Sequence, residues 1–338
     1  MENGLSVLKR AQANPYRAFN ARLGDETSAG ARMRANVLCP VHHVPKFKIP
    51  KSSGFFTTGS CFAREVEIAL GDLGIRLTAE KETFLYEWFN PMHGAVPGRA
   101  DADLDAAQAR PRSPLNRYSP ASMLYDIERA LEHKHSFDQT VIPLDGAQKV
   151  WDPQLKNLIV ADRAFAERMR GVLDRAIVSM KDADVVVMTL GMTETWIDND
   201  SGAVLPTPPG PMQVKRFPDR FRYFVADYAH VMQSLAAIID KVSLHCSRRP
   251  NIILTVSPVP MGSTFTDKDV IVANSRSKST LVAAAQTTAE RYATVDYFPS
   301  YEIVMHSSRD IWHDDSIHIR AEYVAQIMKK FTDSYLTD

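Results

Sequence analysis

The stretch that decides the fold reads Phe55-Phe56-Thr57-Thr58-Gly59-Ser60-Cys61-Phe62-Ala63-Arg64-Glu65. It begins with aromatic and β-branched residues, which favour a strand, and the glycine that follows them marks a turn. From Cys61 onward, apolar residues recur at helical spacing as far as Gly71 and Gly74, which predicts an amphipathic helix. The sequence therefore predicts a strand, residues 54–58, that passes through a glycine turn directly into a helix.

The same alternation of strand and helix continues along the chain. Further strands are predicted at residues 185–190, 252–256 and 294–298. The first two of these are almost entirely apolar, as is typical of central parallel strands that are covered on both faces. Helical spacing of apolar residues predicts helices at residues 120–131, 161–180, 224–244, 273–291 and 321–335. The expected class is α/β with a mostly parallel sheet.

Three segments lack this regular pattern. Residues 1–50 are basic and are predicted to form an N-terminal extension of extended or loop structure before a main domain of residues 51–338. Residues 93–114 are rich in Gly, Pro and Ala and are predicted to be a loop insertion that could act as a lid. Residues 198–220 contain a Pro and Gly cluster and are predicted to be a second insertion near the site.

Composition excludes several classes of protein. The chain has 338 residues, 45% of them hydrophobic and 24% charged, which is typical of a globular protein. Lys and Arg number 40, as do Asp and Glu, so the overall charge gives no reason to expect a nucleic-acid partner. No stretch has the roughly 20 apolar residues of a membrane span, so no membrane insertion is expected. The N-terminus also lacks the apolar core of a signal peptide, which predicts a cytoplasmic protein.

Two side chains at the glycine turn can act as nucleophiles, Ser60 and Cys61. A side chain at a strand-to-helix turn lies at the carboxyl edge of a parallel sheet. The N–H groups of the helix N-terminus can stabilise a thiolate or an oxyanion there. The alternative is purely structural, with Ser60 capping the helix and Cys61 buried in the core.

A base for such a nucleophile is present near the end of the chain, where Asp315 and His318 form an Asp-x-x-His pair. The carboxylate can accept from one imidazole nitrogen and leave the other free as a base. His313 or Asp314 could supply an alternative pairing. A metal site built from these four residues is a further alternative, but it lacks a second ligand group of the usual spacing.

Polar residues also follow the two buried strands. Gly191, Thr193 and Glu194 come after the strand at residues 185–190, and Ser257 comes after the strand at residues 252–256. Thr193 could donate to an oxyanion, and Glu194 could orient a neighbouring group. The alternative is an ordinary turn with a helix cap.

These segments together resemble the GSCFA family, within the wider SGNH hydrolase superfamily. The resemblance is carried by five ordered blocks: Gly59-Ser60-Cys61-Phe62-Ala63, Leu190-Gly191-Met192-Thr193-Glu194-Thr195-Trp196, Thr255-Val256-Ser257-Pro258-Val259, Asp296-Tyr297-Phe298-Pro299-Ser300-Tyr301-Glu302, and the pair Asp315 and His318. It implies a flavodoxin-like, three-layer α/β/α sandwich, as in SGNH hydrolases, that carries out ester hydrolysis or acyl transfer, often on carbohydrates.

The resemblance also assigns roles to residues. Overlaying Gly59-Ser60-Cys61 on the superfamily pattern Gly-Asp-Ser places Cys61, rather than Ser60, at the nucleophile position. It implies that His318 is the base, that Asp315 orients it, and that the helix N-terminus lowers the pKa of the thiol.

The sequence departs from the superfamily in three places. The block Gly-x-Asn-Asp stands here as Gly191-Met192-Thr193-Glu194, so Thr193 would have to replace the asparagine as oxyanion donor. The segment Leu115-Asn116-Arg117-Tyr118 resembles a family segment that offers Asn116 as the remaining side-chain donor. The usual proline after the terminal histidine is replaced by Ile319.

Two functions are compatible with this sequence. The first is an esterase or acyltransferase that acts on an acyl ester or thioester, with a carbohydrate-type substrate or acceptor, through a Cys (or Ser)-His-Asp mechanism. The second is an inactive module that binds a glycan or an acyl-bearing ligand in a pocket lined by Trp196, Tyr86, Trp88 and Tyr118. No resident cofactor is expected, and coenzyme A stays open as an acyl donor.

Overall fold

The centre of the molecule is a parallel sheet of four strands. The computed structural model describes residues 2–20, 26–79, 115–145, 148–156 and 160–337. In this part of the chain the sheet has the order β10-β9-β6-β2. Its strands are β2 (Phe55–Gly59), β6 (Val185–Leu190), β9 (Asn251–Val256) and β10 (Val295–Phe298). All three pairings are parallel, so the four predicted strands and the α/β class are confirmed.

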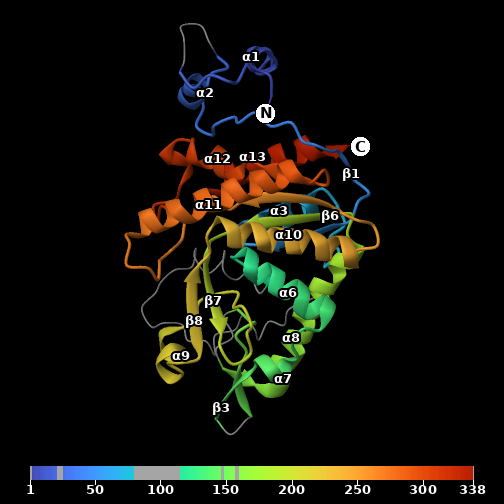
Figure 1. Ribbon diagram of the computed structural model, residues 1–338, viewed down its shortest axis with the longest axis vertical. Coiled ribbons are helices and arrows are strands. Elements are labelled where there is room, and N and C mark those ends of the chain that lie inside the picture. Colours follow the sequence, from blue (N-terminus) through green and yellow to red (C-terminus); the bar gives the residue numbers. More distant parts are fainter. Residues whose placement is uncertain (1, 21–25, 80–114, 146–147, 157–159, 338) are drawn as a thin grey trace.

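Helices cover both faces of this sheet (Figure 1). One face packs against α3 (Cys61–Asp72), α12 (Ser300–Met305) and α13 (Ala321–Tyr335). The other face packs against α6 (Pro120–Glu132), α8 (Arg163–Val178), α10 (Tyr228–His245) and α11 (Val270–Arg291). Successive side chains of β6 alternate between the two apolar cores, with Val185 and Val187 in one and Val186 and Met188 in the other. This period of two explains why the strand is apolar throughout.

Several smaller elements complete the fold. Short 3₁₀ helices lie at η2 (Ser179–Asp182) and η3 (Arg309–Ile311), and β1 (Ile49–Pro50) pairs in parallel with β11 (Leu336–Thr337). A hairpin joins β7 (Glu194–Asp198) to β8 (Phe221–Val225), so the predicted insertion at residues 198–220 is the connection within this hairpin and contains α9 (Pro211–Arg216). A second antiparallel sheet consists of β3 (Ile142–Asp145), β4 (Lys149–Trp151) and β5 (Ala161–Asp162), next to α7 (Phe137–Thr140).

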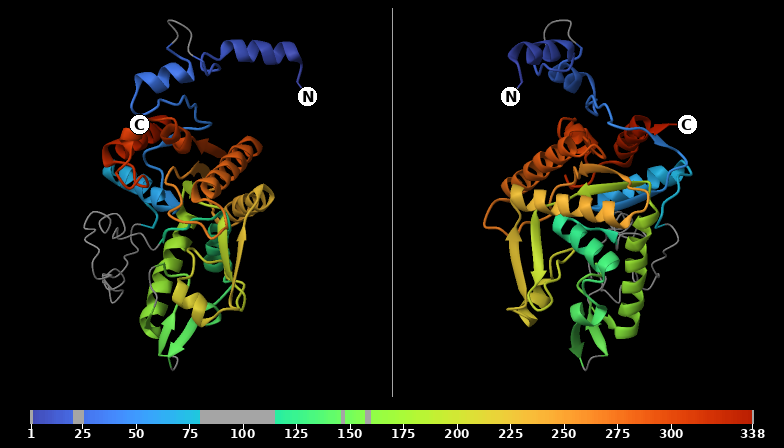
Figure 2. Two further views of the ribbon diagram at one scale, coloured as in Figure 1. Left: turned by 90° about the vertical axis from the view of Figure 1, so that its left-hand side faces the viewer. Right: turned by 45° about the vertical axis from the view of Figure 1, so that its right-hand side comes forward.

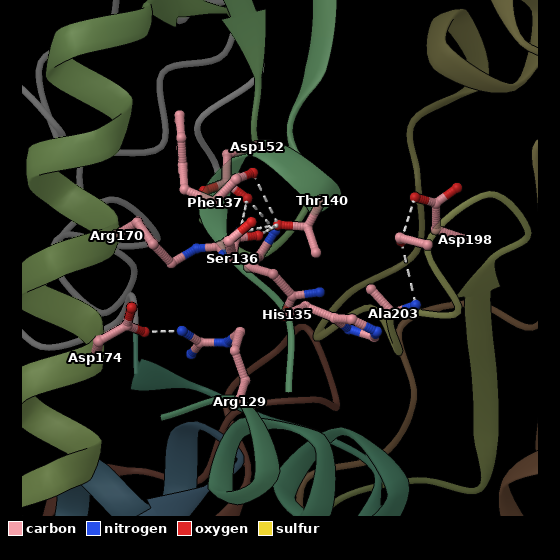
Figure 3. A network of polar contacts seen from close by, with 12 residues as sticks. Arg129, His135, Ser136, Phe137, Thr140, Asp152, Arg170, Asp174, Asp198 and Ala203 are labelled. Atoms are coloured by element: carbon pink, nitrogen blue, oxygen red, sulfur yellow. Dashed lines mark hydrogen bonds and ion pairs between the residues drawn. The ribbon is translucent and has the colours of Figure 1, made fainter. Parts of the chain in front are cut away.

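Ion pairs, all but one of them fully buried, join α6 and α8 to each other and to the segment after β4. Figure 3 shows Arg129 of α6 and Asp174 of α8 pointing toward each other, and Arg170 of α8 pointing toward Asp152. Asp126, also on α6, accepts from Arg129 at 3.0 Å and from Arg117. Unpaired charges are very costly to bury, so these pairs fix how the helices dock.

The N-terminal segment differs from its prediction. Residues 1–50 were expected to be extended or loop structure, but α1 (Gly4–Ala13) and α2 (Ala29–Ala35) are helical. Their N-caps are Asn3, which accepts from Leu5 N at 2.9 Å, and Ser28, which accepts from Ala31 N at 3.3 Å. Neither helix buries a residue, so no apolar stripe predicted it. Both views of Figure 2 show them standing beyond the C-terminal helices.

No helix in the described part of the chain is both long and apolar enough to cross a bilayer. The predicted loop at residues 93–114 lies outside the described residues.

Candidate functional site

The glycine turn after β2 is held tightly against the neighbouring strand. Gly59 has a φ of 134°, and a Cβ atom at this position would lie 2.3 Å from the carbonyl oxygen of Thr189 on β6. Only glycine fits this backbone. The next residue, Ser60, donates its N–H to that same carbonyl at 2.9 Å. The turn is therefore anchored to the central strand of the sheet, and the start of α3 is fixed with it.

Ser60 and Cys61 take different roles at this turn. The Ser60 hydroxyl accepts from Phe62 N at 3.3 Å and caps α3, and its side chain is only 2% exposed. Cys61 is the first residue of the helix, is half-buried and lines a cavity. The structural alternative is thus confirmed for Ser60 as a cap, but Cys61 is not a core cysteine.

The pKa of the Cys61 thiol is set by opposing effects. Burial raises its pKa, whereas Lys156, Lys278 and the N–H of Phe62 act to lower it. The helix N-terminus does act to lower the pKa of the thiol, through the N–H of Phe62, but the desolvation of the thiolate outweighs this effect and the pKa is raised.

Asp315 and His318 form the pair that the sequence predicts. Asp315 Oδ2 lies 2.5 Å from His318 Nδ1, and Asp315 Oδ1 accepts the backbone N–H groups of Ile317 and His318, each at 2.9 Å. A carboxylate only accepts hydrogen bonds, so Nδ1 carries the hydrogen and Nε2 is left as a base. Burial acts to raise the pKa of Asp315, but these bonds from His318 and Ile317 lower it to about 2. The carboxylate is therefore charged at neutral pH.

The nucleophile candidates and the Asp-His pair line one cavity of about 2150 Å³. The predicted site residues that line it are Ser60, Cys61, Asn116, Gly191, Glu194, Ser257, Asp315 and His318. They come from the ends of β2, β6 and β9, from the segment before α6, which carries Asn116, and from the loop before α13. That loop reaches the site because α13 packs beside α3 on the same face of the sheet.

Two of these residues form the wall beside the turn. Asn116 lies next to Gly59 through a parallel bridge and is buried, with no hydrogen-bond partner for its Oδ1 among the described residues. Gly191 donates its N–H to Tyr118 O at 2.9 Å, and a Cβ atom on it would lie 3.3 Å from the Cβ of Ser60. Asn116 thus lines the cavity with an amide oxygen that has no partner among the described residues, while the Gly191 N–H is already used.

The polar residues after β6 and β9 separate into different roles. Ser257 is buried at the wall, and its Oγ has no partner among the described residues. The Glu194 carboxylate accepts from Phe265 N at 3.0 Å and from the Thr264 hydroxyl, so it holds the loop after β9. Thr193 is fully buried and does not line the cavity. Its N–H donates to the Ser277 hydroxyl and its carbonyl accepts from Ala226 N, while its own hydroxyl has no partner among the described residues. The backbone of Thr193 is therefore held in place outside the cavity lining, and its role as an oxyanion donor stays a prediction.

The aromatic pocket of the binding hypothesis is only partly present. Tyr118 lines the cavity, whereas Trp196 packs against Tyr223 and Phe265 with ring centroids 5.1 Å away in both cases. Tyr86 and Trp88 lie outside the described residues. Within the described ranges no three His, Cys, Asp or Glu side chains are grouped as a metal site would require.

Two lysines near the cavity were not among the site residues predicted from the sequence. Lys156 lines the cavity and donates to the Tyr118 hydroxyl at 2.8 Å. Lys278 is buried in α11 and donates to carbonyl groups after β6 and β9. The burial of Lys278 could have been predicted from the sequence, because this residue precedes Leu281 and Ala285 by three and seven residues and so lies on the same buried stripe of the helix. No pattern in the sequence marks Lys156.

The variant Asp315→Ala should release His318 from its fixed tautomer. Its ring is then expected to populate both neutral tautomers, which long-range ¹H–¹⁵N NMR of the imidazole nitrogens resolves. The loss of stability should stay at about 1 kcal/mol or less, because the pair is partly exposed. In the wild type, the contribution of Asp315 to stability is present above about pH 4 and is lost as the pH falls toward its folded-state pKa of about 2.

The matched control for this variant is Asp314→Ala, which removes the adjacent charge but keeps the hydrogen bond between Asp315 and His318. It should retain the wild-type tautomer. An unchanged tautomer in Asp315→Ala would contradict the assigned role of Asp315.

The chain can also be compared with known proteins and protein families. No curated protein matches the chain. The GSCFA family matches residues 54–331, a range that includes the turn at Ser60 and Cys61 and the pair of Asp315 and His318. This match covers most of the sequence and confirms the resemblance that its motifs indicated, so the chain belongs to the GSCFA family.

Proposed function

We propose that this protein is an esterase or acyltransferase of SGNH type in which Cys61 carries the acyl group. The observation that supports this most strongly is that Cys61, at the N-terminus of α3, and the Asp315–His318 pair line the same cavity. A nucleophile, a base with a fixed tautomer and a group that orients the base are the minimal parts of an acyl-enzyme mechanism. The parallel sheet with helices on both faces is compatible with the SGNH-like fold.

The reaction would proceed in two balanced halves. His318 Nε2 takes the thiol proton, and the sulfur of Cys61 forms a bond to the carbonyl carbon of the ester or thioester. The oxyanion faces the N–H of Cys61 and the side-chain amide of Asn116. When it collapses, the bond to the leaving group breaks and His318 returns the proton to that group. Water or an acceptor hydroxyl then gives its proton to His318 and attacks the acyl-Cys61 thioester, which releases the thiol.

The acceptor in this proposal is of carbohydrate type, as in the wider superfamily, and coenzyme A remains an allowed acyl donor. The cavity volume of about 2150 Å³ leaves room for an acyl group and a sugar-sized acceptor together.

A binding module without catalysis is the second candidate, and two observations favour it. Burial raises the pKa of Cys61, which disfavours the reactive thiolate. Thr193, which stands where the superfamily has its asparagine donor, does not line the cavity.

The test is peptide-mapped mass spectrometry after brief exposure to p-nitrophenyl acetate. In the wild type we expect an acetyl group on Cys61, and Cys61→Ala should lose it. His318→Ala should slow its formation by about 10²–10⁴-fold, the usual contribution of a general base. Ser60→Ala should keep the adduct on Cys61, with a loss of about 1 kcal/mol in stability from the missing helix cap.

The matched control is His230→Ala. His230 forms the same kind of pair with Asp227 three residues before it, at 2.7 Å, but it lies on α10 and does not line the cavity. This variant should acetylate at the wild-type rate. An adduct on Ser60 would change the nucleophile, and a folded wild type without any His318-dependent adduct would favour the binding module.

A further inference from the structure

The cavity that contains Cys61 extends beyond the candidate site as a groove between α3 and α13. The two helices pack against each other on the same face of the sheet. Both begin at the site, α3 at Cys61 itself and α13 three residues after His318. At the other end the cavity is lined by Lys51, which follows β1, and by Leu336 and Thr337 of β11. The groove therefore follows both helices from their first turn to their last.

Each helix lines the groove with a stripe of side chains along its whole length. On α3 the lining positions that follow Cys61 include residues 65, 68, 69 and 72. On α13 the same spacing of three and four residues repeats from Ala321 to Asp333. Residues so spaced lie on one face of a helix. At a rise of about 1.5 Å per residue, the stripe on α3 is about 16 Å long from Cys61 to Asp72.

The middle of the groove is apolar and open to solvent. Ile68 of α3 is 46% exposed, and Leu73, which caps the end of this helix, is 52% exposed. On the other side of the groove, α13 contributes Val324, Ala325 and Met328. Single exposed apolar side chains are normal on a protein surface, whereas several that line one cavity are typical of a binding site.

The charged side chains of the groove stand at its rim or near its ends. Lys329 and Asp333 pair with each other at 2.7 Å, and both side chains are largely exposed. Glu65 lies one turn from Cys61, and Asp72 is exposed at the last turn of α3. Between these two carboxylates the lining residues of α3 are uncharged, as are those in the first two turns of α13. This middle stretch therefore offers no charge to a polar ligand.

The occupant that matches this stretch is the acyl chain of the substrate. The carbonyl carbon of an ester has to reach the Cys61 sulfur, so the acyl chain begins where the groove begins. A hydrocarbon chain has no polar group that needs a hydrogen-bond partner, so an uncharged groove can bury it at no cost in hydrogen bonds. The hydrocarbon core of a bilayer is about 30 Å thick, so one lipid acyl chain spans about 15 Å. The groove along α3 is about as long as one such chain.

We propose that the groove between α3 and α13 binds a long acyl chain, and that the substrate is an ester or thioester of a fatty acid rather than of a short acid such as acetate. This inference rests on the proposed function, because it takes Cys61 as the residue that receives the acyl group. The lining residues outside the groove, such as Tyr118 and Lys156, are then left to the leaving group and the acceptor.

The test compares the p-nitrophenyl esters of acetate, butanoate, octanoate and decanoate. The second-order rate constant for acylation of Cys61 is measured from the release of p-nitrophenol, and the adduct is located by peptide mapping. This constant should rise by roughly fourfold for each methylene group that enters the groove, because each one leaves water. Rate constants in the wild type that do not depend on chain length would overturn the proposal.

The variant Ala325→Trp should block the groove. Ala325 is exposed on the second turn of α13, so the fold should tolerate the larger side chain. The ratio of the decanoate rate constant to the acetate rate constant should fall by about tenfold or more, as expected when at least two methylene groups are excluded. The matched control is Gln326→Trp, since Gln326 is also exposed but does not line this cavity. It should keep the wild-type ratio, and a wild-type ratio in a folded Ala325→Trp would contradict the assigned groove.

Binding without reaction separates this inference from the proposed function. In Cys61→Ala, isothermal titration calorimetry should show that decanoate binds about 100-fold or more tightly than acetate, with a negative change in heat capacity. Adding Ala325→Trp, or the exposed change Ile68→Ser, should weaken the binding of decanoate. Decanoate binding that depends on the groove, without any acylation of Cys61 in the wild type, would reject the esterase and keep the groove. Acylation of Cys61 at one rate by all four esters would keep the esterase and reject the groove.

Discussion

Asp126→Ala is expected to lower the free energy of unfolding by about 3–5 kcal/mol, the usual result of removing one partner from a buried ion pair. Asp126 is 2% exposed and lies between two guanidinium groups, those of Arg117 and Arg129. Removing its carboxylate takes away the ion pair that Arg117 makes with Asp126 in the core. Among the residues that the structure describes, Arg129 would keep its ion pair with Asp174 alone (Figure 3).

Removing the carboxylate of Asp126 should also affect the candidate site. Arg117 follows Asn116 directly, donates its backbone N–H to Gly59 O at 2.7 Å and donates its side chain to Asn116 O at 2.9 Å. The ion pair with Asp126 therefore fixes the segment that carries Asn116, the proposed oxyanion donor. In any Asp126→Ala protein that remains folded, acetylation of Cys61 should be slower than in the wild type.

The pH dependence of stability follows from the direction in which the pKa of Asp126 is shifted. Burial acts to raise its pKa, but Arg117 and Arg129 hold that pKa below the ordinary value. A carboxyl group with a depressed folded-state pKa contributes stability above its unfolded pKa, near 4, and loses it as the pH falls through the folded value. The wild type should therefore lose stability below about pH 4 more steeply than Asp126→Ala.

Urea unfolding at neutral pH measures the main effect, with Asp138→Ala as the matched control. Asp138 pairs with Arg163, but its side chain is 76% exposed. Exposed pairs contribute about 1 kcal/mol or less, so this variant should stay close to the wild type. If the two variants lost the same free energy of unfolding, burial would not determine how much these ion pairs contribute to stability.

The sequence predicted the elements whose pattern is local and regular. The strands of the central sheet were found because both of their faces are buried, which makes runs such as Val185–Leu190 apolar. The helix at Cys61 was found because its stripe of apolar residues ends near Gly74, which takes the positive φ of 69° at the helix end. The hairpin of β7 and β8 was missed because its strands are joined by more than 20 residues, so no short turn marks it.

Parts of the site were predictable for the same reason, and others were not. Cys61 and the Asp315–His318 pair lie within short motifs whose chemistry depends on neighbours in the sequence. The position of Thr193 depends on Ser277 and Ala226, which lie 84 and 33 residues further along the chain, so sequence spacing alone does not show that Thr193 lies outside the cavity lining. The effect of burial on the Cys61 thiol likewise arises from packing that no local motif encodes.

Gly59→Ala should be the most damaging change at the turn itself. The φ of 134° at Gly59 is a conformation that side-chain-bearing residues rarely adopt, and the added Cβ would meet the Thr189 carbonyl oxygen at 2.3 Å and its nitrogen at 2.6 Å. The obstructing atoms are backbone atoms of β6, which pairs with strands on both sides and cannot move aside. We expect a loss of roughly 2–6 kcal/mol, since backbone strain and overpacking each cost about 1–3 kcal/mol.

Gly71→Ala provides the comparison on the same helix, because nothing lies within 4 Å of a Cβ at Gly71 and its φ is not in the positive range. This variant should be neutral or stabilised by up to about 1 kcal/mol, the usual gain from replacing a helical glycine. Urea unfolding compares the two variants, and the rate of Cys61 acetylation shows whether the turn still presents the thiol. If Gly59→Ala were as stable as Gly71→Ala, the turn would not be anchored to β6 by close backbone contact. The fixed position of Cys61, on which the proposed mechanism depends, would then lose its structural basis.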